Sequence, residues 1–592
     1  MFIPTSQDEL KHSEWNKLDV ILVTGDSYID SPYSGMAVIG KVLMNAGYRV
    51  GIIAQPDLTS DADISRLGEP SLFWGVSGGT VDSMVANYTA TLHKRRSDDF
   101  TPGGVNNRRP DRAVIAYTNL IKKYFKSNSP IVLGGIEASL RRITHYDYWS
   151  DRLRAPILFD SKADYLLYGM ADRSILELAA SLRDQQSPMG IRGLCYLSKQ
   201  VPEGYIELPS YEEVLADKEA FTRMFHLFYH NNDPLTAHGL VQRKVDRYLV
   251  QNPPPYTLRQ SELDKVAGLD YERAQHPFYA QQGPVKALET IRFAIPTHRG
   301  CYGECNFCAI AVHEGRTVTS RSMESILEEA ARISQHPEFN GQINDLSGPT
   351  ANMYGFECEK KLKLGACEDK HCLYPEICPL LRISHAKQIE LLQQIRRVPG
   401  VKKVSVGSGI RYDMVLADKQ CGMDYLDEVV RYHTSGQLKI APEHSEPVVL
   451  NLMGKPSTES LLKFKEKFQT LSRKAGKEQY LTYYLIAAYP GCSEREMKAL
   501  RKFVLNNLQA LPEQVQVFTP TPSTYASVMY YTETDPFTGN PLFVEKNLHR
   551  KALQKEIITT KGHEHSPRLR TSSKTAMPTI VGNLKRNTYG RK

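Results

Sequence analysis

The stretch Arg299-Gly300-Cys301-Tyr302-Gly303-Glu304-Cys305-Asn306-Phe307-Cys308 follows an apolar, strand-like run at residues 291–296. Its three cysteines are separated by three and then by two residues, on a loop that contains two glycines. Thiolates are the usual protein ligands of iron–sulfur clusters. A four-iron cluster with three protein ligands keeps one iron open, and open positions are typical of reactive metal sites. The spacing therefore predicts a reactive 4Fe–4S cluster bound by Cys301, Cys305 and Cys308, with zinc, bound with the help of His313, as the alternative.

The apolar run before the cysteines is the first unit of a repeating pattern in residues 290–530. Helix-like stretches alternate with six strand-like runs, and in the first of these helices Ile326, Ala330 and Ile333 share one face. The six runs cover residues 291–296, 342–347, 401–408, 438–442, 480–487 and 514–518. This alternation predicts the α/β class and a partial (β/α)6 barrel, whose chemistry lies at the carboxyl ends of its strands.

Residues 1–185 show a second alternation of strands and helices. Strand-like runs at residues 20–23, 50–54, 130–133 and 164–168 are separated by helix-like stretches at 35–46 and 110–125. This order predicts a doubly wound α/β domain with a parallel sheet. Residues 186–289 contain the extended run Asn252-Pro253-Pro254-Pro255 and no clear period. We expect them to form a connecting segment that packs across two domains.

A second cysteine set lies in residues 354–380, which we interpret as an insertion at the mouth of the barrel. Cys358, Cys367, Cys372 and Cys378 fall within 21 residues, with Asp369, Lys370 and His371 among them. In a chain without a secretory signal, such clustering favours metal or redox chemistry over disulfides. The four residues are candidate ligands of an auxiliary iron–sulfur cluster or of a structural zinc ion.

The cysteine loop, with Phe307 before its last cysteine, resembles the signature of the radical S-adenosylmethionine superfamily. Four short motifs narrow the resemblance to the YgiQ-type family. They are Arg299-Gly300-Cys301, His313-Glu314-Gly315-Arg316, Ser320-Arg321-Ser322 and Ala441-Pro442-Glu443-His444. The opening Gly25-Asp26-Ser27-Tyr28 also narrows it, and the resemblance extends to about residue 540.

The resemblance implies an enzyme with a 4Fe–4S cluster and S-adenosylmethionine as cofactors. The open iron would bind the amino and carboxylate groups of S-adenosylmethionine, and one electron would cleave it to a 5′-deoxyadenosyl radical that attacks an unknown substrate. The electron would come from a donor such as flavodoxin or ferredoxin. Many relatives hold the methionine amino group with Gly-Gly-Glu, where this chain has Leu346-Ser347-Gly348-Pro349. The candidate cofactor contacts are Gly348, Ser408, Arg411, Glu443 and Gly491.

The N-terminal region resembles the cobalamin-binding domain that precedes many radical enzymes. The Gly134-Gly135 turn and residues 164–169 carry this likeness. The usual cobalamin loop supplies a histidine ligand, whereas Asp26-Ser27-Tyr28-Ile29-Asp30 contains none. We therefore expect a domain that keeps the shape and has lost the corrinoid.

The charge distribution and the hydropathy of the chain limit the classes of partner that we expect for it. Residues 561–592 hold eight Lys/Arg and one acid, and so account for nearly all of the net charge of +8. This basic tail, which follows an extension at 531–560, is expected to be disordered; it is either solvated or a contact for nucleic acid. No apolar stretch is long enough for a membrane span, so we expect a cytoplasmic protein. Two other functions remain open: a methylthio- or methyltransferase acting on tRNA or another macromolecule, and a non-enzymatic iron–sulfur or zinc protein that binds nucleic acid.

Overall fold

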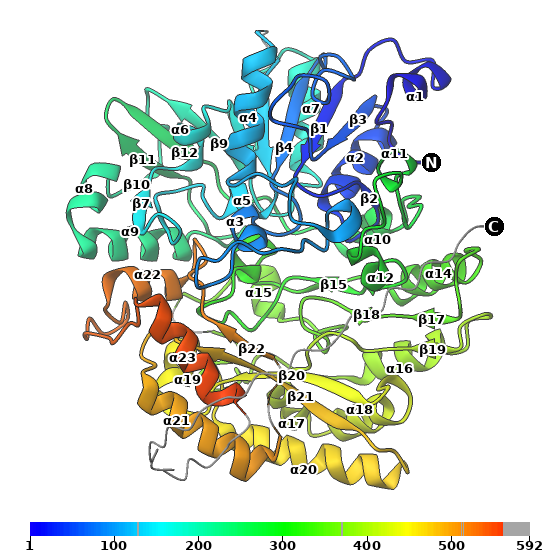
Figure 1. The fold of residues 1–592 in the computed structure, drawn as a ribbon, viewed down its shortest axis with the longest axis vertical. Coiled ribbons are helices and arrows are strands. Elements are labelled where there is room, and N and C mark those ends of the chain that lie inside the picture. Colours follow the sequence, from blue (N-terminus) through cyan, green and yellow to red (C-terminus); the bar gives the residue numbers. More distant parts are fainter. Residues whose placement is uncertain (127–128, 369–370, 511, 513, 561–592) are drawn as a thin grey trace, which may run out of the picture. The chain divides into compact units, whose positions relative to one another are not determined.

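The computed structural model describes residues 1–126, 129–368, 371–510, 512 and 514–560 (Figure 1). Residues Met1–Thr559 form one compact unit. The basic tail at 561–592 lies outside the described residues, so its expected disorder stays a prediction.

A nine-stranded sheet dominates the N-terminal half, with the order β10-β11-β12-β9-β8-β5-β4-β1-β3. Its first five strands along the chain, β1, β3, β4, β5 and β8, are mutually parallel. They span Val20–Thr24, Val50–Ala54, Phe73–Ser77, Ile131–Gly134 and Tyr165–Leu167. This part confirms the doubly wound parallel sheet that the sequence predicts.

Both faces of this sheet are covered, which explains why its strands are continuously apolar. Ile21 and Val23 of β1 belong to one core cluster with helices α4 (Ala113–Tyr124) and α6 (Ile157–Ser161). Val20 and Leu22 point the other way, into a cluster with α2 (Gly35–Asn45) and α7 (Ser174–Arg183). Alternate residues of a strand point to opposite faces, so one apolar run serves two cores.

Residues 186–289 differ from the expected connecting segment, because they contribute four strands to the same sheet. Strand β9 pairs antiparallel with β8, β12 with β9, and β11 with β12, while β10 is parallel to β11. These strands span Leu194–Ser198, Ile206–Leu208, Leu240–Lys244 and Arg247–Gln251. Helices α8 (Tyr211–Ala216), α9 (Lys218–His230) and α10 (Gln260–Ala267) belong to the same range. These strands lie at one side of the sheet, and their antiparallel pairing departs from the strand–helix alternation by which the parallel part could be predicted.

The C-terminal half forms the expected open barrel of six parallel strand segments. Strand β14 pairs with β18, β17 with β19, and β20, β21 and β22 follow in order. An isolated parallel bridge between Ile410 and Ile440 connects the third segment to the fourth. The strands span Ile295–Pro296 (β14), Gln342–Ile343 (β17), Leu346–Ser347 (β18), Lys403–Val404 (β19), Gln437–Glu443 (β20), Tyr480–Ala487 (β21) and Gln514–Val517 (β22).

The first three barrel strands are shorter than the apolar runs predict. The run expected at 291–296 starts at the end of helix α12 (Ala287–Ile291), and only Ile295–Pro296 is strand. For the second and third strands, Asp345 gives a physical reason. One of its carboxylate oxygens accepts hydrogen bonds from the backbone N–H groups of Gly407 (2.7 Å) and Ser408 (3.3 Å). The Asp345 side chain thus takes the place of the main-chain hydrogen bonds that would have continued the neighbouring strand. The run at 342–347 is accordingly split into two short strands.

The barrel helices agree with the sequence patterns. Ile326, Ala330 and Ile333 are buried on α14 (Met323–Ser334), which begins after the N-cap Ser322. The others are α16 (Ala386–Ile395), α18 (Gly422–Glu428) with a π-helical turn at Val429–His433, α20 (Thr458–Lys474) and α21 (Glu494–Phe503) with a π-helical turn at Val504–Leu508. Within the described ranges, no helix is both long and apolar enough to cross a membrane.

Two helices after the barrel tie its C-terminal side to the N-terminal sheet. They are α22 (Tyr525–Thr532) and α23 (Leu548–Thr559). Lys551 of α23 is fully buried, and its Nζ donates to the hydroxyls of Tyr148 (3.0 Å) and Tyr530 (2.9 Å). It also lies over both rings. Burial disfavours the charged amine and so lowers the pKa of Lys551 to about 7. No described residue forms an ion pair with this amine.

This lysine predicts a specific pH dependence of stability. Between pH 7 and the ordinary lysine pKa of 10.5, the unfolded chain holds a proton that the folded chain lacks. The free energy of unfolding of the wild type should therefore rise with pH above 7 relative to Lys551→Met, by at most about 1.4 kcal/mol per pH unit. Urea unfolding at several pH values measures this slope. Exposed Lys555 on the same helix is the control, since Lys555→Met should leave the slope unchanged; parallel curves for wild type and Lys551→Met would contradict the assignment.

Candidate functional site

The cysteine loop begins directly after the first barrel strand. Strand β14 leads into β15 (His298–Arg299), which pairs antiparallel with β16 (Thr319–Ser320). The loop between them holds Cys301, Cys305 and Cys308, all partly buried, and then α13 (Ile310–His313). Their position at the carboxyl end of the first strand is where barrel enzymes carry their chemistry.

Two glycines shape the loop. Gly300 has φ +83°, and a Cβ atom there would overlap the backbone carbonyl of Thr317, so no other residue fits without moving β16. A Cβ at Gly303 would lie 3.3 Å from Cys301 Sγ and 3.7 Å from Cys305 Sγ. Glycine at this position therefore leaves space beside two of the thiols.

The far side of the loop is anchored to the end of the barrel's fourth unit. The backbone N–H of Asn306 donates to the carbonyl of Met453 (3.0 Å), and the side-chain amide of Asn306 donates to the carbonyl of Leu452 (3.0 Å). Tyr489, at the end of β21, donates to the same Leu452 carbonyl (3.1 Å) and its ring contacts that of Phe307 edge-on. The aromatic residue before the last cysteine thus packs against the barrel.

A buried charge network joins the loop to the four-cysteine insertion. Glu304 has a fully buried side chain that accepts from Arg316 (2.7 Å) and from Lys361 (3.1 Å) of helix α15 (Glu359–Leu364). Burial alone would raise the pKa of Glu304, but Lys361 and Arg316 keep it below its ordinary value. Arg316 also donates to the carbonyl of Cys367 (3.0 Å), and the backbone N–H of Cys358 donates to the Tyr302 hydroxyl (3.2 Å). The two cysteine sets are therefore packed against each other.

The four cysteines of the insertion are not equivalent. Cys358, Cys372 and Cys378 are buried in one cluster that also contains Tyr302 and Phe356. Burial raises the pKa of the Cys372 thiol to about 11, against the opposing effect of Lys361. Cys367 is only partly buried and its thiol accepts from Lys360 (3.0 Å). The structure thus brings three of the four predicted ligands into one apolar cluster.

One of the predicted cofactor contacts approaches the first cysteine set, and a second lies in a charged pair. The Nη1 atom of Arg411 lies 3.9 Å from Cys305 Sγ, and its guanidinium is held by Asp413. Glu443, in the left-handed region with φ +67°, has its carboxylate 3.7 Å from Lys455 Nζ. Burial raises the pKa of Glu443, while Lys455 and Arg411 oppose that rise. Arg411 therefore places a charge beside the first cysteine set.

The other three predicted contacts have different surroundings. Ser408 donates to the second carboxylate oxygen of Asp345 (2.6 Å). Gly348 lies under the ring of His298, so close that any Cβ would overlap it. Gly491 donates from its backbone to Phe543 (2.7 Å) and packs on Leu452, near the Asn306 anchor.

Several residues at the site escape sequence analysis. Thr350 has its hydroxyl 3.6 Å from Cys301 Sγ, and only its place two residues after Gly348 could have indicated it. Asp413 and Lys455 are the ion partners of Arg411 and Glu443. As the structure stands, no three His, Cys, Asp or Glu side chains among the described residues are arranged around a single metal-ion position.

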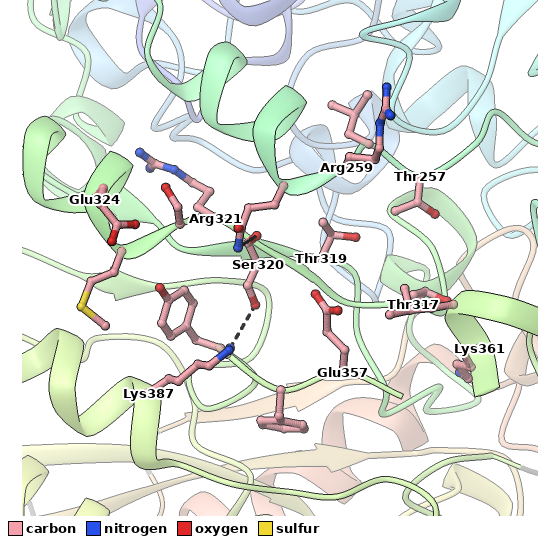
Figure 2. A pocket seen from close by; sticks show the side chains of 18 of the residues that line it. Thr257, Arg259, Thr317, Thr319, Ser320, Arg321, Glu324, Glu357, Lys361 and Lys387 are labelled. Atoms are coloured by element: carbon pink, nitrogen blue, oxygen red, sulfur yellow. Dashed lines mark hydrogen bonds between the residues drawn. The ribbon is translucent and has the colours of Figure 1, made fainter. Parts of the chain in front are cut away.

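Two cavities flank the β15–β16 hairpin. An outer cavity of about 1020 Å³ is lined by Thr319, Ser320, Glu357 and Lys387, among others, and Figure 2 shows how these side chains surround it. An inner cavity of about 470 Å³ lies between the carboxyl edge of the large sheet and the first barrel strand. Gly348 lines the inner one.

Comparison with known proteins identifies the family. A family model described as "Radical SAM N-terminal" matches residues 2–294, and a domain of unknown function, DUF3362, matches residues 513–587. A UPF0313 protein of Fusobacterium nucleatum is 54% identical over 561 residues, which cover 95% of this chain and 99% of that one. A UPF0313 protein of Thermotoga petrophila is 49% identical over 569 residues, or 95% and 100% of the two chains. The chain belongs to the UPF0313 family.

Together with the N-terminal family model, this makes the chain a radical S-adenosylmethionine enzyme of the YgiQ type. Two solved structures are also similar. The radical S-adenosylmethionine methyltransferase TsrM from Kitasatospora setae, with cobalamin and a [4Fe-4S] cluster bound, aligns at 14% identity and TM-score 0.49, over 86% of this chain and 77% of that one. The cobalamin-dependent enzyme OxsB aligns at 12% identity and TM-score 0.47, over 90% and 58%.

The strained glycine predicts a loss of iron. Gly300→Ala should displace the loop from β16 and reduce the iron bound per chain after anaerobic reconstitution several-fold. Gly315→Ala is the matched control, because Gly315 also has positive φ (+109°) but faces open space. It carries the same backbone strain without the overlap. Equal iron contents in the two variants would contradict the role of Gly300.

Proposed function

We propose that this UPF0313 protein holds a 4Fe–4S cluster on Cys301, Cys305 and Cys308 and uses it with S-adenosylmethionine. The donor set supports this proposal: three thiols on one loop, with Gly303 leaving space between Cys301 and Cys305. When bound, the cluster would supply one electron that divides S-adenosylmethionine into methionine and a 5′-deoxyadenosyl radical, which becomes 5′-deoxyadenosine on taking a hydrogen atom from the substrate. The electron donor would be a flavodoxin- or ferredoxin-type protein.

The chain's own residues would orient the cosubstrate and shield it from water. Arg411 and Glu443 are the best-placed charges, since Arg411 lies 3.9 Å from Cys305 Sγ and both are held by buried ion partners. A fixed cation and anion suit the carboxylate and ammonium groups of a methionine moiety. Gly348 and the Thr350 hydroxyl would line the second strand's end beside them. Ser408 and Gly491 have a weaker case, because their polar groups already have partners within the protein.

We further propose that Cys358, Cys372 and Cys378, with Cys367, bind an auxiliary iron–sulfur cluster. The apolar burial of three thiols and their direct packing on the first loop support this over a zinc role, which remains the alternative. The N-terminal domain would act without a corrinoid, since its loop at residues 26–30 contains no histidine. A second hypothesis is that the auxiliary site serves a methylation or methylthiolation reaction on tRNA. Binding of nucleic acid by the tail concerns residues outside the described part.

Loss of one central cysteine tests the proposed reaction. Cys305→Ala should abolish formation of 5′-deoxyadenosine from S-adenosylmethionine under dithionite, because the remaining two thiols cannot hold the cluster. Cys421→Ala, which removes an isolated and partly exposed cysteine, should keep wild-type turnover. Chromatography of the quenched mixture measures the product. If the fully reconstituted wild type made no 5′-deoxyadenosine, the non-enzymatic reading would replace the proposal.

The auxiliary site has its own test. Cys372→Ser should lower the iron content by about half, while the 5′-deoxyadenosine yield in the absence of substrate persists. Iron and zinc are both measured on reconstituted full-length protein. If iron stayed unchanged and one equivalent of zinc disappeared, the insertion would be a zinc site.

A further inference from the structure

A third, narrow space adjoins the two cavities beside the β15–β16 hairpin. It measures about 70 Å³ and shares lining residues with both cavities. With the outer cavity it shares Pro234, Tyr256, Thr257, Leu258, Thr317 and Thr319. With the inner cavity it shares Gly169, Met170, Leu263, Arg299, His313 and Glu314. The three spaces therefore lie next to one another along the hairpin.

Most ionisable groups that line the inner cavity are paired. Asp26 is paired with Arg109 at 2.7 Å, Asp172 with Arg299 at 2.7 Å, and Arg321 with Glu329. Glu314 is the exception: it has no ion pair among the described residues, and its carboxylate accepts from the backbone N–H of Gly300 (3.2 Å). The remaining walls are mostly apolar and include Leu22, Val38, Ile39, Val76, Leu133 and Ile175. A largely apolar occupant therefore suits the inner cavity, because a buried anion would find no unpaired cation there among the described residues.

Two imidazoles face this cavity in their neutral form. His298 and His313 line it, and each has one buried ring nitrogen without a hydrogen-bond partner in the described part of the chain. Burial lowers the pKa of both to about 4. They add hydrogen-bonding capacity without adding charge.

The outer cavity differs from the inner one in the charge of its lining residues. Glu324, Glu357, Glu390 and Lys387 line the outer cavity, and none of them has an ion pair with any described residue. Thr319 and Ser320 add hydroxyls, and Figure 2 shows these side chains around the same space. Polar, hydratable groups thus gather in the outer cavity.

From this gradient we infer that the substrate is an elongated amphipathic small molecule, whose uncharged apolar segment enters the inner cavity while its polar head stays in the outer one. The inference rests on the proposed radical chemistry, because the inner cavity ends at Gly348 and His298, beside the carboxyl ends of β14 and β18. That is where the apolar segment would meet the cosubstrate.

A homologous series of n-alkyl-β-D-glucosides tests the inference by calorimetry on reconstituted full-length protein, below micelle-forming concentrations. Affinity should rise about fourfold per added methylene from hexyl to octyl, as expected for burial of each group in an apolar cavity. The glucoside of 8-hydroxyoctanoate, which carries a carboxylate at the inner end, should bind at least tenfold more weakly than the octyl compound. Equal affinities along the series would overturn the inference.

Two variants test whether the alkyl glucosides bind in the inner cavity. Ala171→Trp, which fills the inner cavity that Ala171 lines, should remove the chain-length dependence. Ala180→Trp, on α7 and outside the cavity lining, should retain it. If Ala171→Trp fails to fold, the wild-type series and the carboxylate probe still decide the question. Displacement of octyl glucoside by hydroxocobalamin would assign the cavity to a corrinoid and overturn the inference. These outcomes do not depend on 5′-deoxyadenosine formation, so they are independent of the test of the proposed function.

Discussion

A single buried carboxylate fixes the geometry of both cysteine sets. Glu304 sits between Cys301 and Cys305 in a left-handed backbone conformation with φ +45°, and its side chain is fully buried. Its charge is balanced by Arg316, which lies just before β16, and by Lys361 of the insertion. Removing one partner of a buried ion pair typically costs about 3–5 kcal/mol, because the other charge is left uncompensated. The loop, the hairpin and the insertion can therefore take only one mutual arrangement.

This arrangement explains how a loop with an unfavourable backbone conformation is stable. A non-glycine residue with positive φ is uncommon and costs free energy. Here the cost is offset by hydrogen bonds that reach Glu304 from Arg316 and Lys361 and by the Tyr229 hydroxyl at 3.3 Å. Two residues before Glu304, the Tyr302 ring stacks beside Phe356, and its hydroxyl accepts from the Cys358 backbone N–H. The first cysteine set is thus positioned by contacts that the second provides.

Sequence patterns could predict the parts of this molecule that depend on local periodicity. The burial of Ile326, Ala330 and Ile333 on α14 follows from their helical spacing, and the parallel strands of both halves follow from apolar runs that end in turns. Contacts between distant segments could not be predicted in this way. Nothing in the local pattern of 342–347 indicates that Asp345 binds the backbone of Gly407, and no period marks β9–β12 as a continuation of the first sheet. The partners of Glu304, 12 and 57 residues further along the chain, are equally invisible without coordinates.

The connection between the two halves follows from the direction of their strands. Parallel strands gather their carboxyl ends at one edge, where open sheets and barrels hold ligands. The inner cavity lies where both edges meet, since it is lined by Thr24, Ser77 and Gly134 from the large sheet and by Pro296 and Gly348 from the barrel. Protein walls therefore line this space on two sides. The N-terminal sheet supplies walls beside the first barrel strand that the open barrel alone would lack.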